Sequence, residues 1–221
     1  MKKIIILNGS PRKNFNTATL LKEAQKGVES SGAEVEYFNL GDINYKGCVS
    51  CFACKRKGAL DNPLCVYKDD LTPILEKILN SDGVIIGSPI YYSYPTGMTR
   101  NLLERMMFAA GTYLKDGNGA YTKRKLDRTI PVGIIYTMNC PEGLSKQFDY
   151  PTILAPDKNY LGHIFGYCEV LNSYDTYQFS DYSKYDIDLF DEKHKSEVRE
   201  KQFPIDKENA FNLGKKLAEF S

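Results

Sequence analysis

The sequence predicts a doubly wound α/β fold, in which helices cover both faces of a parallel β-sheet. Three observations support this prediction. Short apolar runs of strand length alternate along the chain with stretches of helical periodicity. The runs, such as KIIILN and GVIIGS, are apolar throughout, which is typical of strands buried on both faces of a sheet. Apolar residues make up 42% of the 221 residues, enough for a sizeable core.

The expected elements follow one another in the order that such a sheet requires. Strands are expected at Lys3–Asn8, Glu34–Leu40, Gly83–Ser88, Ile130–Thr137 and Gly166–Ser173. Helical spacing of apolar residues is found at Thr17–Ser31, Leu71–Leu79, Gly97–Ala110 and Asp206–Phe220. Five parallel strands with right-handed crossovers favour the flavodoxin-like strand order 2-1-3-4-5. We therefore expect a flavodoxin-like, doubly wound, five-stranded parallel sheet flanked by helices.

We expect a single domain over residues 1–221, because the sequence contains no internal repeat or low-complexity linker. Three segments depart from the alternation of strands and helices. A cysteine-rich loop is expected at about 46–66, and a polar, glycine-containing loop at Lys115–Arg128. A longer insertion is expected at about 139–162, where three prolines should break any single helix.

Charge and composition exclude several classes of function. Against 29 Lys and Arg stand 28 Asp and Glu, so the net charge of +1 lacks the basic excess of a nucleic-acid binder. The first apolar run, Ile4–Leu7, is too short for a signal-peptide core or a membrane span, so we expect a cytoplasmic protein without a membrane partner. In that reducing compartment the six cysteines are expected to be thiols or metal ligands rather than disulfides. The presence of only two histidines disfavours a catalytic dyad or metal site built on histidine.

The loop after the first strand, Gly9–Thr17, leads directly into the first helix. Unpaired backbone N–H groups and the helix dipole at such a helix start favour an anion. Ser10, Asn16 and Thr17 add short polar side chains, and Arg12 offers a planar fork suited to phosphate oxygens. The alternative is an ordinary capped turn with solvated charges. The loop matches neither a Walker motif nor a dinucleotide fingerprint.

The loop after the third strand, Ser88–Gly97, carries three tyrosines within four residues. Alternation along a strand would bury only some of them, so they are hard to explain as core residues. Planar, amphipathic rings are suited to packing against a flat heterocycle, and ligands of such sheets bind at the carboxyl ends of the strands. The alternative is that these rings pack against a neighbouring loop or a second subunit.

These segments together resemble the flavodoxin-like NAD(P)H-dependent FMN reductases and the related iron–sulfur flavoproteins. The resemblance rests on GSPRKNFNTATLL, on C-x2-C-x2-C followed by CVYKDDL, on GSPIYYSYPTGMTRNLLERM and on QFPIDKENAFNLGKKL, which together span nearly the whole chain. It implies FMN as the bound ligand. The residues that it implies for the FMN phosphate are Ser10, Arg12, Asn16 and Thr17. Those that it implies for the isoalloxazine ring are Pro89, Ile90, Tyr91 and Tyr92, with Thr137 from the loop after the fourth strand.

Four cysteines in the loop after the second strand form a candidate metal site: Cys48, Cys51, Cys54 and Cys65. Four thiolates can hold a [4Fe–4S] cluster or a tetrahedral zinc ion. The triplet spacing favours a ligand set, but the ten residues before Cys65 make the last interval longer than the compact spacing of iron–sulfur flavoproteins. Three alternatives therefore stay open: a [4Fe–4S] cluster, zinc, or free thiols.

The expected function is that of an FMN-dependent oxidoreductase or electron-transfer flavoprotein. The resemblance implies NAD(P)H as the electron donor, and the acceptor is expected to be a small molecule or a protein. Because the flavin supplies the redox chemistry, no catalytic side chain is expected. The alternative is a metal-binding or interaction module that keeps the fold and has lost the flavin.

The helix expected at Gly97–Ala110 is more apolar than one buried face requires. An additional apolar stripe favours a homodimer or higher homo-oligomer. Burial of this stripe under residues 111–128 of the same chain is the alternative.

Overall fold

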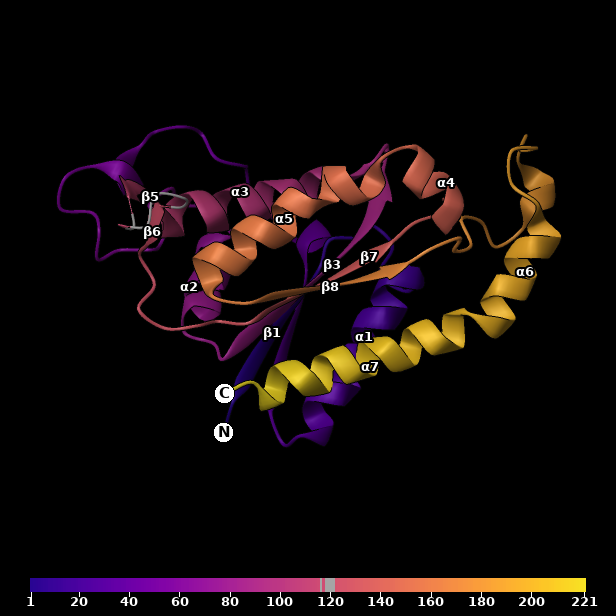
Figure 1. Cartoon of the computed structure of the whole chain (residues 1–221), viewed down its shortest axis with the longest axis horizontal. Helices are drawn as coiled ribbons and strands as arrows, with labels where there is room; N and C mark the ends of the chain where they lie inside the picture. Colours follow the sequence, from indigo (N-terminus) through magenta and orange to yellow (C-terminus); the bar gives the residue numbers. More distant parts are fainter. Residues whose placement is uncertain (116, 118–121) are drawn as a thin grey trace.

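The computed structural model describes residues 1–115, 117 and 122–221 (Figure 1). Five parallel strands form the main sheet in the order β2-β1-β3-β7-β8, which confirms the predicted flavodoxin-like order. These strands are β1 (Lys3–Asn8), β2 (Glu34–Asn39), β3 (Gly83–Tyr91), β7 (Val132–Thr137) and β8 (Cys168–Ser173). The α-helices are α1 (Asn16–Ser30), α2 (Thr72–Leu79), α3 (Gly97–Ala110), α4 (Glu142–Gln147), α5 (Tyr150–Phe165), α6 (Glu192–Lys201) and α7 (Phe203–Glu219).

Helices cover both faces of the sheet. Ile4 and Ile6 of β1 belong to the core beneath α1 and α7. Ile5 and Leu7 point to the other face, into the core beneath α2, α3 and α5. Figure 1 shows α1 and α7 on one side of the strands and α3 and α5 on the other. Burial on both faces explains why the strands are apolar throughout.

Two glycines bring α1 and α7 into direct backbone contact. A Cβ atom on Gly27 would lie 1.9 Å from the carbonyl oxygen of Phe211, and one on Gly214 would lie 1.9 Å from that of Ala24. Any larger side chain at either position would separate the two helices. This contact fixes α1, whose first turn faces the candidate site.

The segment between β7 and β8 is the main departure from the predicted elements. Instead of a proline-broken insertion, it forms the crossover helices α4 and α5. Pro151 lies in the first turn of α5, where a backbone N–H has no helical partner. Pro156 lies inside α5, so the prediction that it breaks the helix is wrong. Burial of Leu161 and Phe165 against the sheet stabilises the helix despite the lost hydrogen bond.

The third strand continues beyond its predicted end and turns back on itself. β3 pairs with the short antiparallel strand β4 (Tyr94–Pro95). Tyr92 and Ser93 form the turn, with left-handed φ angles of 48° and 73°. Two left-handed residues are typical of a tight two-residue hairpin. The hairpin projects from the carboxyl end of the sheet.

Within the polar loop predicted at Lys115–Arg128, Thr122–Arg124 form the short strand β6, which pairs with β5 (Gly111–Lys115) in a two-stranded ribbon. Residues 116 and 118–121 of that loop lie outside the described residues. The described residues also form three short 3-10 helices: η1 (Leu40–Asp42), η2 (Ala53–Lys55) and η3 (Tyr182–Lys184). Across the described ranges, no helix combines the length and the apolar character that crossing a bilayer requires.

Candidate functional site

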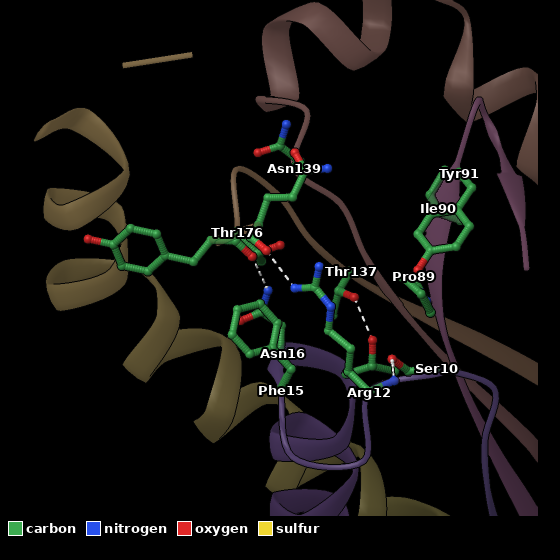
Figure 2. A pocket seen from close by; sticks show the side chains of 13 residues that line it. Ser10, Arg12, Phe15, Asn16, Pro89, Ile90, Tyr91, Thr137, Asn139 and Thr176 are labelled. Atoms are coloured by element: carbon green, nitrogen blue, oxygen red, sulfur yellow. Dashed lines mark hydrogen bonds between the residues drawn. The ribbon is translucent and has the colours of Figure 1, made fainter. Parts of the chain in front are cut away.

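A pocket that is partly open to solvent lies at the carboxyl ends of the parallel strands (Figure 2). Sheets of this topology bind ligands at this edge. The lining residues are Ser10, Arg12, Phe15, Asn16, Thr17, Pro89, Ile90, Tyr91, Thr137, Asn139, Thr176, Tyr177 and Gln178. Eight of the nine residues predicted for the ligand are therefore brought together in one pocket, and Tyr92 is not.

Local hydrogen bonds shape the loop after β1. The side-chain oxygen of Asn8 accepts from the Ser10 N–H at 3.0 Å, and the Ser10 hydroxyl accepts from the Arg12 N–H at 3.1 Å. Gly9 packs so closely on α3 that a Cβ atom there would lie 1.9 Å from the hydroxyl oxygen of Thr99. The loop can therefore pass the sheet edge only with glycine at this position, and it leads directly to the start of α1.

Helix α1 begins at the pocket without a side-chain cap. Phe15 occupies the cap position and provides no capping hydrogen bond. The first helical bond runs from the Thr19 N–H to the Phe15 carbonyl at 2.8 Å, so the N–H groups of Asn16, Thr17 and Ala18 precede it. The first turn contains no acidic residue. Open N–H groups and an uncompensated helix dipole together favour an anion at this end of the pocket.

A further wall comes from the segment after β8, which the sequence prediction missed. Arg12 Nη1 donates to the carbonyl oxygen of Gln178 at 2.5 Å, and Asn16 Nδ2 donates to that of Tyr177 at 2.6 Å. These bonds close the segment against the start of α1. The signal that could have found it is its position: it follows a predicted strand, Gly166–Ser173, at the same sheet edge as the other loops.

The end of β3 supplies an apolar wall, Pro89–Tyr91 (Figure 2). Tyr91 stands at the mouth with 50% of its surface exposed, whereas Tyr92 is 96% exposed and lies outside the pocket lining. Thr137, from the end of β7, is buried and shares a 2.7 Å hydrogen bond with the Thr17 hydroxyl. The pocket thus combines a polar end at α1 with a largely apolar wall at β3.

Asn139, in the loop after β7, is held by a buried ion pair. Lys195 of α6 is 1% exposed, and its Nζ donates to the Asn139 carbonyl at 2.8 Å and to Asp175 Oδ1 at 2.6 Å. Burial lowers the pKa of Lys195, and Asp175 opposes this effect. In the described part of the chain the side-chain oxygen of Asn139 is buried and has no hydrogen-bond partner.

The four cysteines of the predicted metal site line a second, small pocket. They belong to the loop before α2, which is purple in Figure 1. The lining of this pocket is Cys48, Val49, Cys51, Phe52, Cys54, Cys65, Val66, Tyr67, Arg105, Phe108 and Ala109. No group of three or more metal-ligating side chains in the described ranges is arranged to hold a single metal ion. The structure therefore gathers the four thiols around one mainly apolar space without bringing them to one point.

Arg105 of α3 lines this cysteine pocket and bonds several groups around it. Its side chain is fully buried, and Nε donates to the sulfur of Cys65 at 2.9 Å. Its other nitrogens bond Asp69 at 2.8 Å and the Tyr67 carbonyl at 2.7 Å. Burial alone would raise the pKa of Asp69, but hydrogen bonds from Arg105 and the Lys46 amide hold it below its ordinary value.

Two lysines place further positive charge beside the thiols. Lys125 Nζ donates to the carbonyl oxygens of Cys54 at 2.6 Å, Ala59 at 2.8 Å and Asn62 at 2.9 Å. Burial raises the pKa of the Cys54 thiol, whereas the charges of Lys55 and Lys125 oppose that rise. The pocket is consequently suited to a group that carries negative charge.

The strand order, together with a pocket at the carboxyl ends and the uncapped start of α1, defines a flavodoxin-like fold. The family of NADPH-dependent FMN reductases matches residues 2–130, and the chain belongs to this family. Two curated relatives are iron–sulfur flavoproteins. One, from Methanocaldococcus jannaschii, is 35% identical over 103 residues, which are 47% of this chain and 51% of the relative. Another, from Archaeoglobus fulgidus, is 36% identical over 107 residues, 48% of this chain and 50% of the relative.

The chain thus spans about half the length of the curated relatives it matches. Solved structures extend the likeness in fold to the whole chain. The NAD(P)H:quinone oxidoreductase of Methanothermobacter marburgensis superposes with a TM-score of 0.66 at 12% identity, covering 100% of this chain and 98% of its own. An azoreductase from Bacillus anthracis gives 0.65 at 11% identity, with 98% and 100% covered. At these identities the likeness establishes the fold alone.

Proposed function

We propose that this protein is an FMN-dependent oxidoreductase or electron-transfer flavoprotein that receives electrons from NAD(P)H. The observation that carries the proposal is the layout of the first pocket, which the open start of α1 and the largely apolar wall Pro89–Tyr91 both line. Such a layout suits an anionic group joined to a planar heterocycle. Membership of the NADPH-dependent FMN reductase family supports the same cofactor.

The donor set of the pocket fits the FMN phosphate. The Ser10 hydroxyl and the N–H groups that open α1 would bind it, together with the guanidinium of Arg12. Asn16 and Thr17 would contribute backbone N–H groups, because their side chains already bond Tyr177 and Thr137.

The apolar wall would hold the isoalloxazine ring. Pro89, Ile90 and Tyr91 would pack on the ring, and Thr137 would border it from the end of β7. Tyr92 lies outside the lining, and we leave it out of the proposed ring contacts. When bound, FMN supplies the redox chemistry, whereas the chain binds it, orients it and limits its contact with water.

Spectroscopy of the purified protein tests this proposal. The expected result is a pair of flavin absorbance bands that survive desalting and are bleached anaerobically by NADH or NADPH. A protein that retains no flavin after incubation with excess FMN would instead support the interaction module that has lost its cofactor.

For the cysteine pocket we propose a [4Fe–4S] cluster ligated by Cys48, Cys51, Cys54 and Cys65. The ligands of a cubane cluster surround a larger group than a single ion, which suits four thiols around one space. The adjacent positive charges would offset the negative charge of a thiolate-bound cluster. Two relatives with the name iron–sulfur flavoprotein support this proposal over zinc and free thiols.

Metal analysis of anaerobically purified protein distinguishes the three alternatives. About four iron and four sulfide per chain are expected for the cluster. The Cys65→Ser variant should lose most of this iron, while Cys168→Ser, which removes a thiol on β8, should retain it. Zinc without sulfide, or no metal at all, would reject the cluster.

We also propose the cytoplasm as the compartment of this protein and a small molecule or protein as its electron acceptor. All six cysteines are unpaired in the structure, which is the usual state of thiols in a reducing compartment.

A further inference from the structure

We propose that Lys195 is a positioning residue for the ligand pocket, because from α6 it holds the loop after β7 and the segment after β8 in the arrangement that binds the flavin. This inference rests on the proposed flavin function and adds to it a residue that touches no ligand. Within the described part of the chain, the pocket lining includes neither Lys195 nor its partner Asp175. Lys195 therefore acts on the flavin only through the pocket walls that it fixes.

The ammonium group of Lys195 bonds both of these walls. Its Nζ donates to the carbonyl oxygen of Asn139 at 2.8 Å and to Asp175 Oδ1 at 2.6 Å. Asn139 lines the pocket, and Asp175 directly precedes residues 176–178, which also line it. In Figure 2, Asn139 lies across the pocket from the wall Pro89–Tyr91. One buried ammonium thus ties together the two segments that form this side of the pocket.

The same two segments also bond each other beside the ion pair. The Asp175 N–H donates to the Cys140 carbonyl at 3.0 Å, and the Thr176 N–H donates to the Met138 carbonyl at 3.0 Å. Asp175 has a left-handed φ of 53°, a conformation that is uncommon outside glycine and persists where surrounding contacts hold it. The bond from Lys195 to the Asp175 carboxylate is such a contact.

The composition of α6 indicates that this ion pair serves to fix geometry. In α6, all of whose residues are described, Lys195 is the one buried residue. A buried charge is costly unless it is paired, and apolar residues can often replace such a pair without loss of stability. Hydrogen bonds add direction, because they hold particular atoms at particular distances. Arg199, one turn later, donates to Asn16 Oδ1 at 3.2 Å, so α6 contacts three segments that line the pocket.

Loss of the Lys195 ammonium should release the two segments from the arrangement that binds flavin. When only one arrangement binds a ligand, the apparent affinity falls with the fraction of molecules in that arrangement. We expect Lys195→Met to lower this fraction to about a tenth, so FMN should bind roughly tenfold more weakly. Most of the loss should be in the association rate, because the contacts of the bound flavin do not change.

Stopped-flow binding of FMN and hydrogen exchange of the apoprotein test this inference together. In Lys195→Met, FMN should associate about tenfold more slowly, and the amides of Asp175 and Thr176 should exchange at least about tenfold faster than in the wild type. His194 Nε2 lies 2.8 Å from Asp175 Oδ2, so this variant leaves the carboxylate a neighbour. Asp175→Asn, a second variant, keeps a side-chain oxygen and should change both rates in the same direction by less.

Asp157→Asn is the matched control, because Asp157 is also a buried carboxylate in an ion pair, 2.6 Å from Arg100, and lies outside the pocket lining. It should leave FMN association and the exchange of both amides unchanged. Unchanged association in Lys195→Met, a loss confined to the dissociation rate, or an equal loss in Asp157→Asn would overturn the inference. A wild-type protein that binds no FMN would overturn the proposed function, while exchange in the ligand-free protein would separately decide whether Lys195 holds the two segments.

Discussion

Arg12 joins two parts of the pocket that are far apart in the sequence. Its guanidinium bonds the carbonyl of Gln178 and lies 4.8 Å from the centre of the Phe15 ring. Its backbone N–H bonds the Ser10 hydroxyl. Arg12 therefore holds the segment after β8 in place and also places positive charge beside the open start of α1.

Arg12→Ala should weaken FMN binding by about 1.5–3 kcal/mol through loss of a charged hydrogen bond to the phosphate. Calorimetric titration of the apoprotein measures this change. Lys13→Ala is the control, because Lys13 pairs with Asp42 and lies outside the pocket lining. Riboflavin, which lacks the phosphate, should lose less affinity than FMN. Equal losses for the two ligands would mean that Arg12 acts only by holding the segment after β8.

Tyr91→Ala should weaken FMN binding by about 1 kcal/mol and shift the flavin reduction potential, because an aromatic contact with the ring is lost. Tyr91→Phe retains the ring and should behave almost like the wild type. Tyr92→Ala provides the comparison, since Tyr92 is 96% exposed and does not line the pocket. Titration and potentiometry that show no difference between Tyr91→Ala and Tyr92→Ala would contradict a stacking role for Tyr91.

The sequence predicts most of the ligand pocket because its residues follow predicted strands at one sheet edge. Ser10 and Thr137 illustrate this, since each follows or ends a strand and lines the pocket. The other pocket residues could not be predicted, because their positions depend on how the chain packs in three dimensions. The unpartnered oxygen of Asn139 depends on how its loop packs, and Tyr177 is placed by bonds to a helix that begins far earlier in the chain.

Among the elements, the cysteine-rich loop depends on α3 for its shape. It contains only one short 3-10 helix, Ala53–Lys55, so its own backbone bonds are few. The buried Arg105 replaces them with bonds to the sulfur of Cys65, to Asp69 and to the Tyr67 carbonyl. The loop is therefore expected to lose its shape before the sheet unfolds.

Asp69→Asn should destabilise the protein by about 3 kcal/mol near neutral pH, because it leaves the fully buried Arg105 without its carboxylate. Asp61→Asn, an exposed position in the same loop, should change stability by less than about 0.5 kcal/mol. Urea unfolding monitored by circular dichroism measures both. A loss no larger than that of the control would contradict the role given to this ion pair.

The same pair predicts a pH dependence. The pKa of Asp69 in the folded state lies below the ordinary value of 3.8, so the ionised carboxyl contributes its full stabilisation above about pH 4. This contribution is lost as the pH falls through the folded-state pKa. The stability difference between wild type and Asp69→Asn should therefore shrink in acid, and a difference that grows there would contradict this assignment.

The strands and most helices were predictable because burial on both faces makes their apolar patterns strong. Gly97–Ala110 has the predicted ends, since Thr96 caps α3 by accepting from the Thr99 N–H. The α5 helix was not predictable from local rules. Its internal Pro156 argues against a helix, and the burial of Phe165 and its neighbours that outweighs this is a property of the packed sheet.

Across the whole molecule, the apolar face of α3 that favoured a homodimer is covered within one chain. Met106 is buried, and Phe108 contacts the ring of Phe52 from the cysteine-rich loop, with 5.9 Å between ring centres. Tyr113 of β5 packs on the other side, at 6.2 Å. The homodimer stays a prediction, as does the single domain over residues 1–221. Light scattering at micromolar concentration tests the homodimer, and a monomer mass would contradict it.

The central claim is that the pocket at the carboxyl ends of the strands binds a flavin through its phosphate. Calorimetric titration of the apoprotein with FMN and with riboflavin tests it most directly. We expect FMN to bind at least about tenfold more tightly, because the start of α1 and Arg12 supply charge-assisted hydrogen bonds that riboflavin cannot use. Equal affinity for the two compounds, or binding of neither, would contradict the account.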